Sequence, residues 1–331
     1  MLVIFNSLKG GNKINRFLSK KKYIFPALWM LNKHILPRVD IYSAPPYDTP
    51  FHYPPVFIIG APRSGSTLLF QVLINTFDVA YLSNLHCQFF GAPAYAERVI
   101  SALKKNKALS NYTSYLGQTS GALEPSECGE WWYRFFRRNP AYVTIDDVDE
   151  GKMHNFRRSL FALTEAAGKP VFFKNLYASI RLEAISAHIP ESLYIIIKRE
   201  ELYNASSILA ARRKTLGHYD KWWSVPPPDI ATLQEKEPAE QAIGQIRCIY
   251  SEIDRVIRKK YISPINTIEV KYEELCHNVH GTVKRLSKFF SSNGLFVNFT
   301  LENIPQRFLV HRSVSINKKL FAELQKILSI E

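Results

Sequence analysis

The sequence predicts an α/β fold in which a mostly parallel sheet lies between two layers of helices, a three-layer sandwich. Short, unbroken apolar runs recur along the chain, as is typical of parallel strands buried on both faces. Segments with apolar residues at helical spacing separate these runs. The first run ends at Gly60, and a short loop leads from there directly into a helix. Together these three features predict a sheet whose strands are joined by helices.

The first strand and the loop after it form the most informative stretch. Residues 56–59 are four consecutive apolar residues, and a glycine-framed loop follows over residues 61–65. From Ser66 onwards, Leu68, Leu69 and Val72 recur at helical spacing. The first N–H groups of a helix have no intrahelical partner, and the helix dipole adds positive charge there. This arrangement therefore predicts an anion-binding loop.

The loop resembles the phosphate-binding loop GxxxxGK[ST] of nucleoside triphosphatases without its lysine. Gly60, Gly65 and Thr67 match that pattern, but Ser66 stands in place of the lysine. The cation lies inside the loop instead, as Arg63, whose planar guanidinium suits a tetrahedral oxyanion. We therefore expect a P-loop-like fold that binds a nucleotide with a short anionic arm and no metal.

The remaining elements follow in order from the same patterns. Further strands are expected over residues 78–82, 168–175, 191–200 and 265–275. Helices are expected over residues 152–167, 180–190, 200–213, 242–256 and 279–290.

Cations stand where two of these strands end. The strand at residues 168–175 has Lys174 near its end, and the next one ends on Lys198 and Arg199. Binding sites of parallel sheets open at the carboxyl ends of the strands, so these cations are expected at the site. Ser207 follows Arg199 by two helical turns, which would bring its hydroxyl to the same phosphate.

Two aromatic stretches are candidates for the acceptor site. Residues 121–140 combine Glu124 and Glu127 with Trp131 and Trp132, which suits either a sugar-like acceptor or a capped helix with a buried aromatic face. Residues 218–238 are rich in proline, contain two more tryptophans and are expected to form a loop over the acceptor.

Composition and net charge limit the possible size of the core, the partners and the compartment. The 331 residues are 46% hydrophobic, enough for a full core, and we expect an N-terminal segment over 1–52 and a single domain over 53–331. The net charge of +14 implies an anionic partner: a nucleotide, nucleic acid or a membrane surface. A basic flank at residues 20–22 suits peripheral membrane contact, although a helix packed on the domain is favoured. Four scattered cysteines indicate neither zinc nor disulfides, and hence a cytoplasmic protein.

Two motifs resemble the nucleotide signatures of sulfotransferases that use 3′-phosphoadenosine 5′-phosphosulfate (PAPS). They are GAPRSGSTLL at residues 60–69 and IIIKREELYNASS at residues 195–207. FFKN, with Lys174, and VKYEEL, with Tyr272, are similar to landmarks of the glycan and protein-tyrosine branches. The resemblance implies that PAPS is the donor, that adenosine 3′,5′-bisphosphate is the product and that no metal is needed. The donor-site residues it implies, with Ser313 added from the basic C-terminal segment, are Arg63, Ser64, Gly65, Ser66, Thr67, Arg199, Ser207, Tyr272 and Ser313.

The general base is less well defined. The related branches use a glutamate in the loop after the second short strand, where this chain has no carboxylate. His86 is the first candidate in that loop, and Glu127 and then Glu124 come next. Arg63 and Lys174 would stabilise the charge that develops during sulfuryl transfer.

Two other classes of protein remain as alternatives. A small-molecule kinase would share the strand, loop and helix, but it should carry a loop lysine and a metal-binding aspartate. A nucleic-acid-binding protein would explain the charge, but it predicts interleaved basic and aromatic patches. We therefore expect a sulfotransferase that acts on a hydroxyl, on a glycan or glycolipid, and no nucleic-acid partner.

Overall fold

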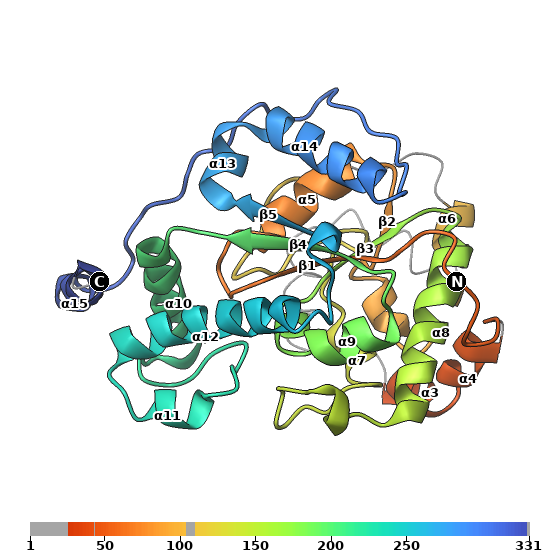
Figure 1. Cartoon of the computed structure of the whole chain (residues 1–331), viewed down its shortest axis with the longest axis horizontal. Helices are drawn as coiled ribbons and strands as arrows, with labels where there is room; N and C mark the ends of the chain where they lie inside the picture. Colours follow the sequence, from red (N-terminus) through yellow and green to blue (C-terminus); the bar gives the residue numbers. More distant parts are fainter. Residues whose placement is uncertain (1–25, 43, 104–109, 330–331) are drawn as a thin grey trace.

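A computed structural model describes residues 26–42, 44–103 and 110–329, and its centre is a parallel five-stranded sheet (Figure 1). The strand order is β2-β3-β1-β4-β5, and every neighbouring pair is parallel. The strands are β1 (Val56–Gly60), β2 (Ala80–Tyr81), β3 (Val171–Lys174), β4 (Leu193–Lys198) and β5 (Thr267–Lys271). The predicted α/β sandwich with a parallel sheet is therefore confirmed.

Helices cover both faces of this sheet. Val56 and Ile58 pack in one apolar cluster with α5 (Ser66–Thr76) and α14 (Val279–Ser292). Phe57 and Ile59 point to the opposite face, in a cluster with α8, α9, α10 and α12. Figure 1 shows α5, α13 and α14 above the sheet and α9 and α12 below it. The remaining helices on these faces and at the edges are α6 (Pro93–Leu103), α7 (Gly129–Trp132), α8 (Glu150–Ala167), α9 (Leu182–His188), α10 (Glu201–Leu216), α11 (Ile230–Gln234), α12 (Pro238–Arg258) and α13 (Tyr272–His277).

The tryptophan pair at residues 131 and 132 belongs to the core. Both side chains are at most 1% exposed. Trp131 stacks on Phe173 of β3 with ring centroids 5.6 Å apart, and both tryptophans contact Phe156 of α8. Of the two interpretations, the buried aromatic face is therefore correct, although the helix at this point, α7, is only one turn long. These rings cannot stack on an acceptor sugar.

Two regions contain helices that the sequence analysis did not predict. The proline-rich segment 218–238, expected to be a loop, contains the short helix α11. The basic C-terminal segment ends in helix α15 (Lys318–Ser329), which packs on α10 and α12 through Leu320 and Leu324. Apolar residues at helical spacing in α15 explain this packing.

The N-terminal helices α3 (Pro26–His34) and α4 (Leu36–Tyr42) pack on the domain. Helix α4 contacts α6 and α8, and α3 contacts the 3₁₀ helix η1 (His86–Phe89). The basic flank at residues 20–22 lies outside the described residues. No helix within the described ranges is long and apolar enough to cross a membrane.

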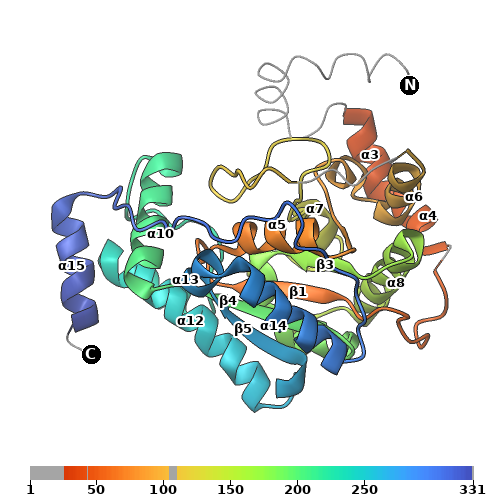
Figure 2. The ribbon, with the colours of Figure 1, turned by 90° about the horizontal axis from the view of Figure 1, so that it is seen from above.

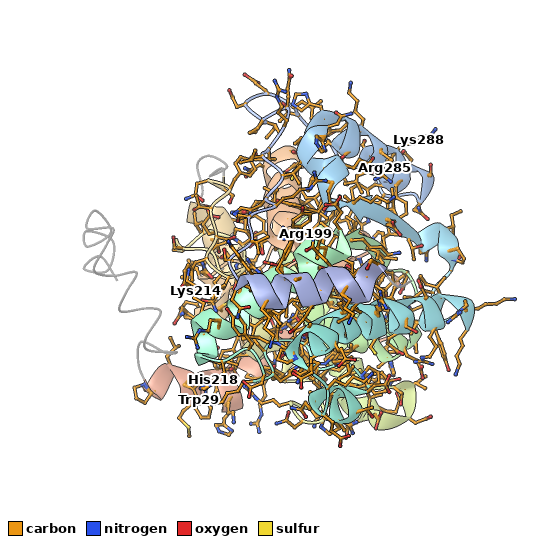
Figure 3. The ribbon with its side chains drawn as sticks, turned by 90° about the vertical axis from the view of Figure 1, so that its left-hand side faces the viewer. Trp29, Arg199, Lys214, His218, Arg285 and Lys288 are labelled. Carbon is orange, nitrogen blue, oxygen red and sulfur yellow. The ribbon has the colours of Figure 1, made fainter. Side chains whose placement is uncertain are left out.

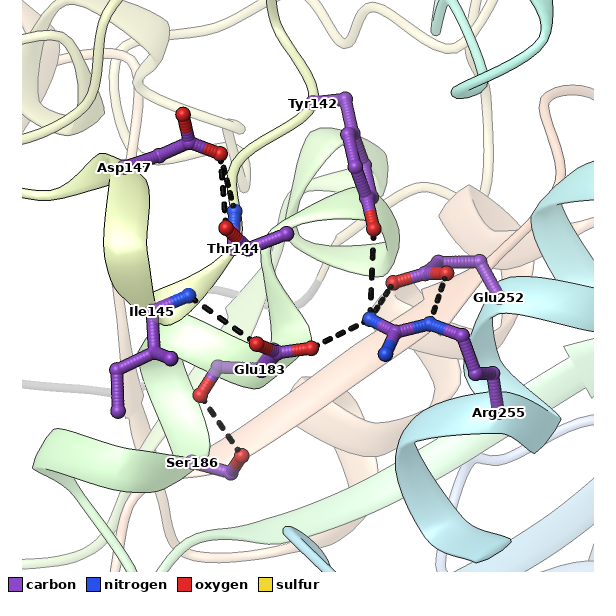
Figure 4. A network of polar contacts seen from close by, with 8 residues as sticks. All are labelled: Tyr142, Thr144, Ile145, Asp147, Glu183, Ser186, Glu252 and Arg255. Atoms are coloured by element: carbon purple, nitrogen blue, oxygen red, sulfur yellow. Dashed lines mark hydrogen bonds and ion pairs between the residues drawn. The ribbon is translucent and has the colours of Figure 1, made fainter. Parts of the chain in front are cut away.

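An ion-pair network fixes α12 beneath the sheet (Figure 4). Arg255 of α12 lies 2.7 Å from Glu252 of the same helix and 2.5 Å from Glu183 of α9. Both carboxylates are 6% exposed, and Tyr142 contacts the same guanidinium at 3.4 Å. Glu252, and then Glu183, raise the pKa of Arg255. The network holds α12 in place, so that the Tyr250 hydroxyl can donate to the Ile197 carbonyl of β4, at 2.7 Å.

Candidate active site

Contacts from two elements hold the loop after β1 in place. Ser179 of η3 (Leu176–Ile180) accepts the Gly60 N–H at 2.9 Å and donates to the Gly60 carbonyl at 3.1 Å. Asn204 of α10 donates to the Pro62 carbonyl at 2.6 Å. Arg63 adopts a positive φ of 64°, which is uncommon for a residue other than glycine. The loop is thus fixed from outside in a conformation that it would not favour alone.

The N-terminus of α5 lacks an internal cap. Its N-cap residue is Gly65, and no side chain accepts a hydrogen bond from the first turn. These amides are therefore suited to an anion. Gly65 also has a φ of 92°, and a Cβ added to it would lie 2.3 Å from the Tyr272 ring. The predicted donor-site residue Tyr272 thus packs directly on the loop.

Two arginines and a serine from separate elements meet beside the loop. Arg199, which follows β4, donates to the Arg63 carbonyl at 3.0 Å. Arg63 Nε donates to the Ser207 hydroxyl of α10 at 3.1 Å. The structure thus joins Arg63, Arg199 and Ser207, three of the predicted donor-site residues, in one cluster. Figure 3 shows Arg199 on the same side of the molecule as α15.

The electrostatics of this cluster favour an anion. Neither arginine forms an ion pair within the described part of the chain. Burial, and then the positive charge of Arg199, lower the pKa of the Arg63 guanidinium. Burial likewise lowers the pKa of Arg199. Two desolvated cations side by side are costly without a counter-ion, so the cluster is suited to a negatively charged group.

A chain of polar side chains leads from the loop to Glu127. Lys174, at the end of β3 and only 4% exposed, donates to the Thr67 hydroxyl at 3.1 Å and pairs with Glu127. The Glu127 side chain is 38% exposed. The structure therefore brings Thr67, Lys174 and Glu127, three of the predicted site residues, into contact.

A tight turn that sequence reasoning missed lies against the same groups. Tyr115 and Gln118 exchange two backbone hydrogen bonds, of 2.8 and 3.0 Å, around Leu116 and Gly117. Both central residues have positive φ, as a type I′ turn requires. The Gly117 carbonyl accepts from Thr67 at 3.3 Å, and a Cβ on Gly117 would lie 4.0 Å from Lys174 Nζ. Leu-Gly is not a strong turn signal, and Thr67 lies 50 residues away, so the sequence offered no indication of this contact.

His86 is engaged within the fold. It is 2% exposed, and its Nδ1 accepts the Ser83 N–H at 3.1 Å. Its Nε2 lies 2.9 Å from the Glu97 carboxylate. Glu124 receives the Ser110 hydroxyl at 2.5 Å and the Asn111 N–H at 3.3 Å. The hydrogen bonds of both residues are thus directed to the scaffold around the site.

The C-terminal segment closes over Arg199. Its guanidinium donates to the His311 carbonyl and faces the Tyr272 ring at 4.8 Å. The Tyr272 hydroxyl in turn accepts the His311 N–H at 3.2 Å. Ser313 is exposed and lies 3.0 Å from the His311 ring, one step outside the arginine cluster. Among the described residues, no group of three or more histidines, cysteines or acids is placed to hold a metal ion.

Fold and site together define an α/β protein of the P-loop-like class, with a phosphate-type loop that has no lysine. Comparison with known protein families identifies one match: the model of the sulfotransferase family matches residues 54–293. The match covers most of the chain, which therefore belongs to the sulfotransferase family, as its motifs indicated.

Individual relatives are distant. The omega-hydroxy-beta-dihydromenaquinone-9 sulfotransferases Stf3 of Mycobacterium bovis and Mycobacterium tuberculosis are each 22% identical over 255 residues, which is 70% of this chain. The match spans only 61% of the length of those relatives. The crystal structure of sulfotransferase STF9 from Mycobacterium avium is 14% identical and superposes with a TM-score of 0.50 over 92% of this chain and 80% of that one. It shares the fold.

Proposed function

We propose that this protein transfers a sulfuryl group from PAPS to an acceptor hydroxyl. The observation that supports this most directly is the cluster of Arg63, Arg199 and Ser207 beside the uncapped start of α5. It offers two guanidinium groups and a row of free amides, but no loop lysine. Such a site suits a nucleotide with separate anionic ends.

Bound PAPS would supply an activated sulfuryl group on a phosphate leaving group. The loop amides from Ser64 to Thr67 would hold the 5′ end of the donor. Arg199 and Ser207 would select its 3′-phosphate, with Tyr272 packed beside them. Arg63 and Lys174 would stabilise charge as the bond from sulfur to the bridging oxygen breaks and the bond to the acceptor oxygen forms.

Glu127 is the base we favour for the proton of the acceptor hydroxyl. Its carboxylate pairs with Lys174, which contacts Thr67, whereas His86 is bonded to Ser83 and Glu97. Glu127 is also partly exposed, so an acceptor can approach it. A base must come within hydrogen-bond reach of the proton it takes, and Glu127 meets this condition better.

For the acceptor, we propose a molecule with a lipid part, either a glycolipid or a hydroxylated lipid. The burial of Trp131 and Trp132 removes two stacking platforms that supported a sugar-like acceptor, a glycan or glycolipid. The Stf3 relatives are named for a menaquinone-derived substrate, which supports a lipid-like acceptor. The proposed compartment is the cytoplasm, since all four cysteines are free thiols.

The test is transfer of radiolabelled sulfate from PAPS to a panel of glycolipids, hydroxylated lipids, free glycans and phenols. We expect labelled product with a lipid acceptor, its loss with Arg199→Ala, and unchanged transfer with Lys288→Ala, which removes an exposed cation on α14. Adenosine 3′,5′-bisphosphate should raise the melting temperature, because a ligand of the native state stabilises it. Stabilisation by ATP with Mg²⁺ but not by the bisphosphate would support a kinase and refute the proposal.

A further inference from the structure

One end of the molecule exposes an unusual concentration of large apolar side chains. Helices α3, α4 and α6 lie together at this end in both Figure 1 and Figure 2. Helix α4 contacts both α3 and α6, and α3 and α6 each contact η1, so these elements adjoin one another. We call this surface the apolar face; its six defining residues are between 37% and 56% exposed, and they are Met30, Leu31, Ile35, Val39, Tyr95 and Val99.

Helix α6 shows most clearly that this exposure is unusual. Its exposed positions are Tyr95, Arg98, Val99, Ser101 and Ala102, and the apolar ones among them recur at helical spacing. The opposite side of the same helix is already buried, with Ile100 5% exposed. A surface helix normally presents polar residues to water, so α6 lacks a partner for its second apolar side.

The exposed charge on this face is entirely positive. Lys33, Arg38 and Arg98 are exposed. Asp40 and Glu97 are the only carboxylates in residues 26–42 and 86–103, and they are 2% and 6% exposed. Asp40 bonds to Ser159 at 2.5 Å, and Glu97 lies 2.9 Å from His86. The acids are thus used inside the fold, and the cations remain outside.

The segments that flank this face in the sequence are also basic. Residues 1–25, which precede α3, contain six lysines and arginines, and residues 104–109, which follow α6, contain three lysines. Neither stretch contains an acidic residue. Both lie outside the described residues.

We propose that the apolar face docks on the surface of a bilayer that contains anionic lipids. Its apolar side chains would enter the headgroup region, and its cations would meet lipid phosphates. Nucleic acid would use the charge but leave the apolar residues exposed to water. A second copy of the same face would bring like charges together. The proposal is independent of the catalytic assignment, because it needs neither donor nor acceptor.

Vesicle sedimentation with the full chain tests it. We expect the protein to pellet with vesicles of phosphatidylcholine containing about one third phosphatidylglycerol, to remain largely free of pure phosphatidylcholine, and to be released by salt. The double variant Ile35→Asp/Val39→Asp should bind at least about tenfold more weakly, since each apolar side chain favours the bilayer and each carboxylate repels it.

The matched control is Ile265→Asp, at a position 65% exposed in the 3₁₀ helix η4 (Pro264–Asn266), away from this face. It should bind vesicles as the wild type does, and all variants should keep the wild-type melting temperature. Equal binding to neutral and anionic vesicles, no binding to either, or binding of RNA in preference to vesicles would each overturn the proposal. So would a dimer in solution that the double variant dissociates, because it would assign the face to self-association.

Discussion

Gly65 provides a sharp test of how the phosphate loop is built. Its φ of 92° lies in the left-handed region, and an added Cβ would lie 2.3 Å from Cδ2 of Tyr272. The tyrosine cannot move away freely, because its hydroxyl accepts the His311 N–H at 3.2 Å and its ring faces Arg199 at 4.8 Å. Gly65→Ala must therefore distort either the loop or the Arg199 site.

Two separate costs add up in this variant. Left-handed backbone costs an alanine about 1–2 kcal/mol. Overpacking against the ring adds about 1–3 kcal/mol, so we expect a total loss of unfolding free energy of about 2–5 kcal/mol. Gly217→Ala is the matched control: Gly217 has a φ of 79°, but an added Cβ would find nothing within 4 Å. It should show only the first cost.

Urea denaturation of the two variants, and of Gly65→Ala combined with Tyr272→Ala, separates these terms. The double variant removes the clash. Its loss of unfolding free energy should therefore be about 1–3 kcal/mol smaller than the sum of the losses in the two single variants. Gly65→Ala should also weaken binding of adenosine 3′,5′-bisphosphate, measured by calorimetry. If Gly65→Ala costs no more than Gly217→Ala and the coupling is zero, the tyrosine does not constrain the loop and the reasoning fails.

Three further predictions concern other groups. Glu127→Gln should lower kcat by about 10²–10⁴-fold with little change in bisphosphate affinity, as expected for a base. If His86→Asn lowers kcat more than Glu127→Gln does, at unchanged stability, His86 is the base instead. Arg199→Ala should weaken bisphosphate binding about 10- to 150-fold, which is what one hydrogen bond to a charged group contributes. The control is Lys198→Ala: this lysine pairs with Glu269, so its loss should have a smaller effect in the same titration. Arg255→Met should lower the unfolding free energy by about 3–5 kcal/mol, because it strands two buried carboxylates. The raised pKa of Arg255 means that its ion pairs stabilise the wild type fully at every pH below the ordinary arginine value. The deficit in urea titrations should therefore be the same at about pH 7 and about pH 9, and a deficit that disappears between them would contradict this account.

The sequence predicted β1, β3 and β4 well because their apolar runs are buried, so local composition carries the signal. The strand expected over residues 265–275 is shorter, because residues 272–275 belong to α13. The positions of Lys174 and Arg199 at the carboxyl ends of β3 and β4 were predicted correctly, because the carboxyl ends of parallel strands all lie on the same side of the sheet. The turn at Gly117 was missed because its contact with Thr67 depends on tertiary packing. The same limit applies to His86: only the fold shows that Glu97, eleven residues on, lies against its ring. Burial of the tryptophan pair likewise depends on Phe156 and Phe173, which are distant in sequence.

Three features that cost stability coincide in this loop. Asp149 caps α8 and Asn278 caps α14 through their side chains, whereas α5 begins without such a bond. Arg63 adopts a left-handed backbone conformation and shares a desolvated space with Arg199. Each of these features costs stability, and all three occur at one point, which is typical of a functional site. A single bound anion would satisfy the amides and neutralise the guanidinium groups together, so the strain in this loop is best explained by a ligand that comes from outside the chain.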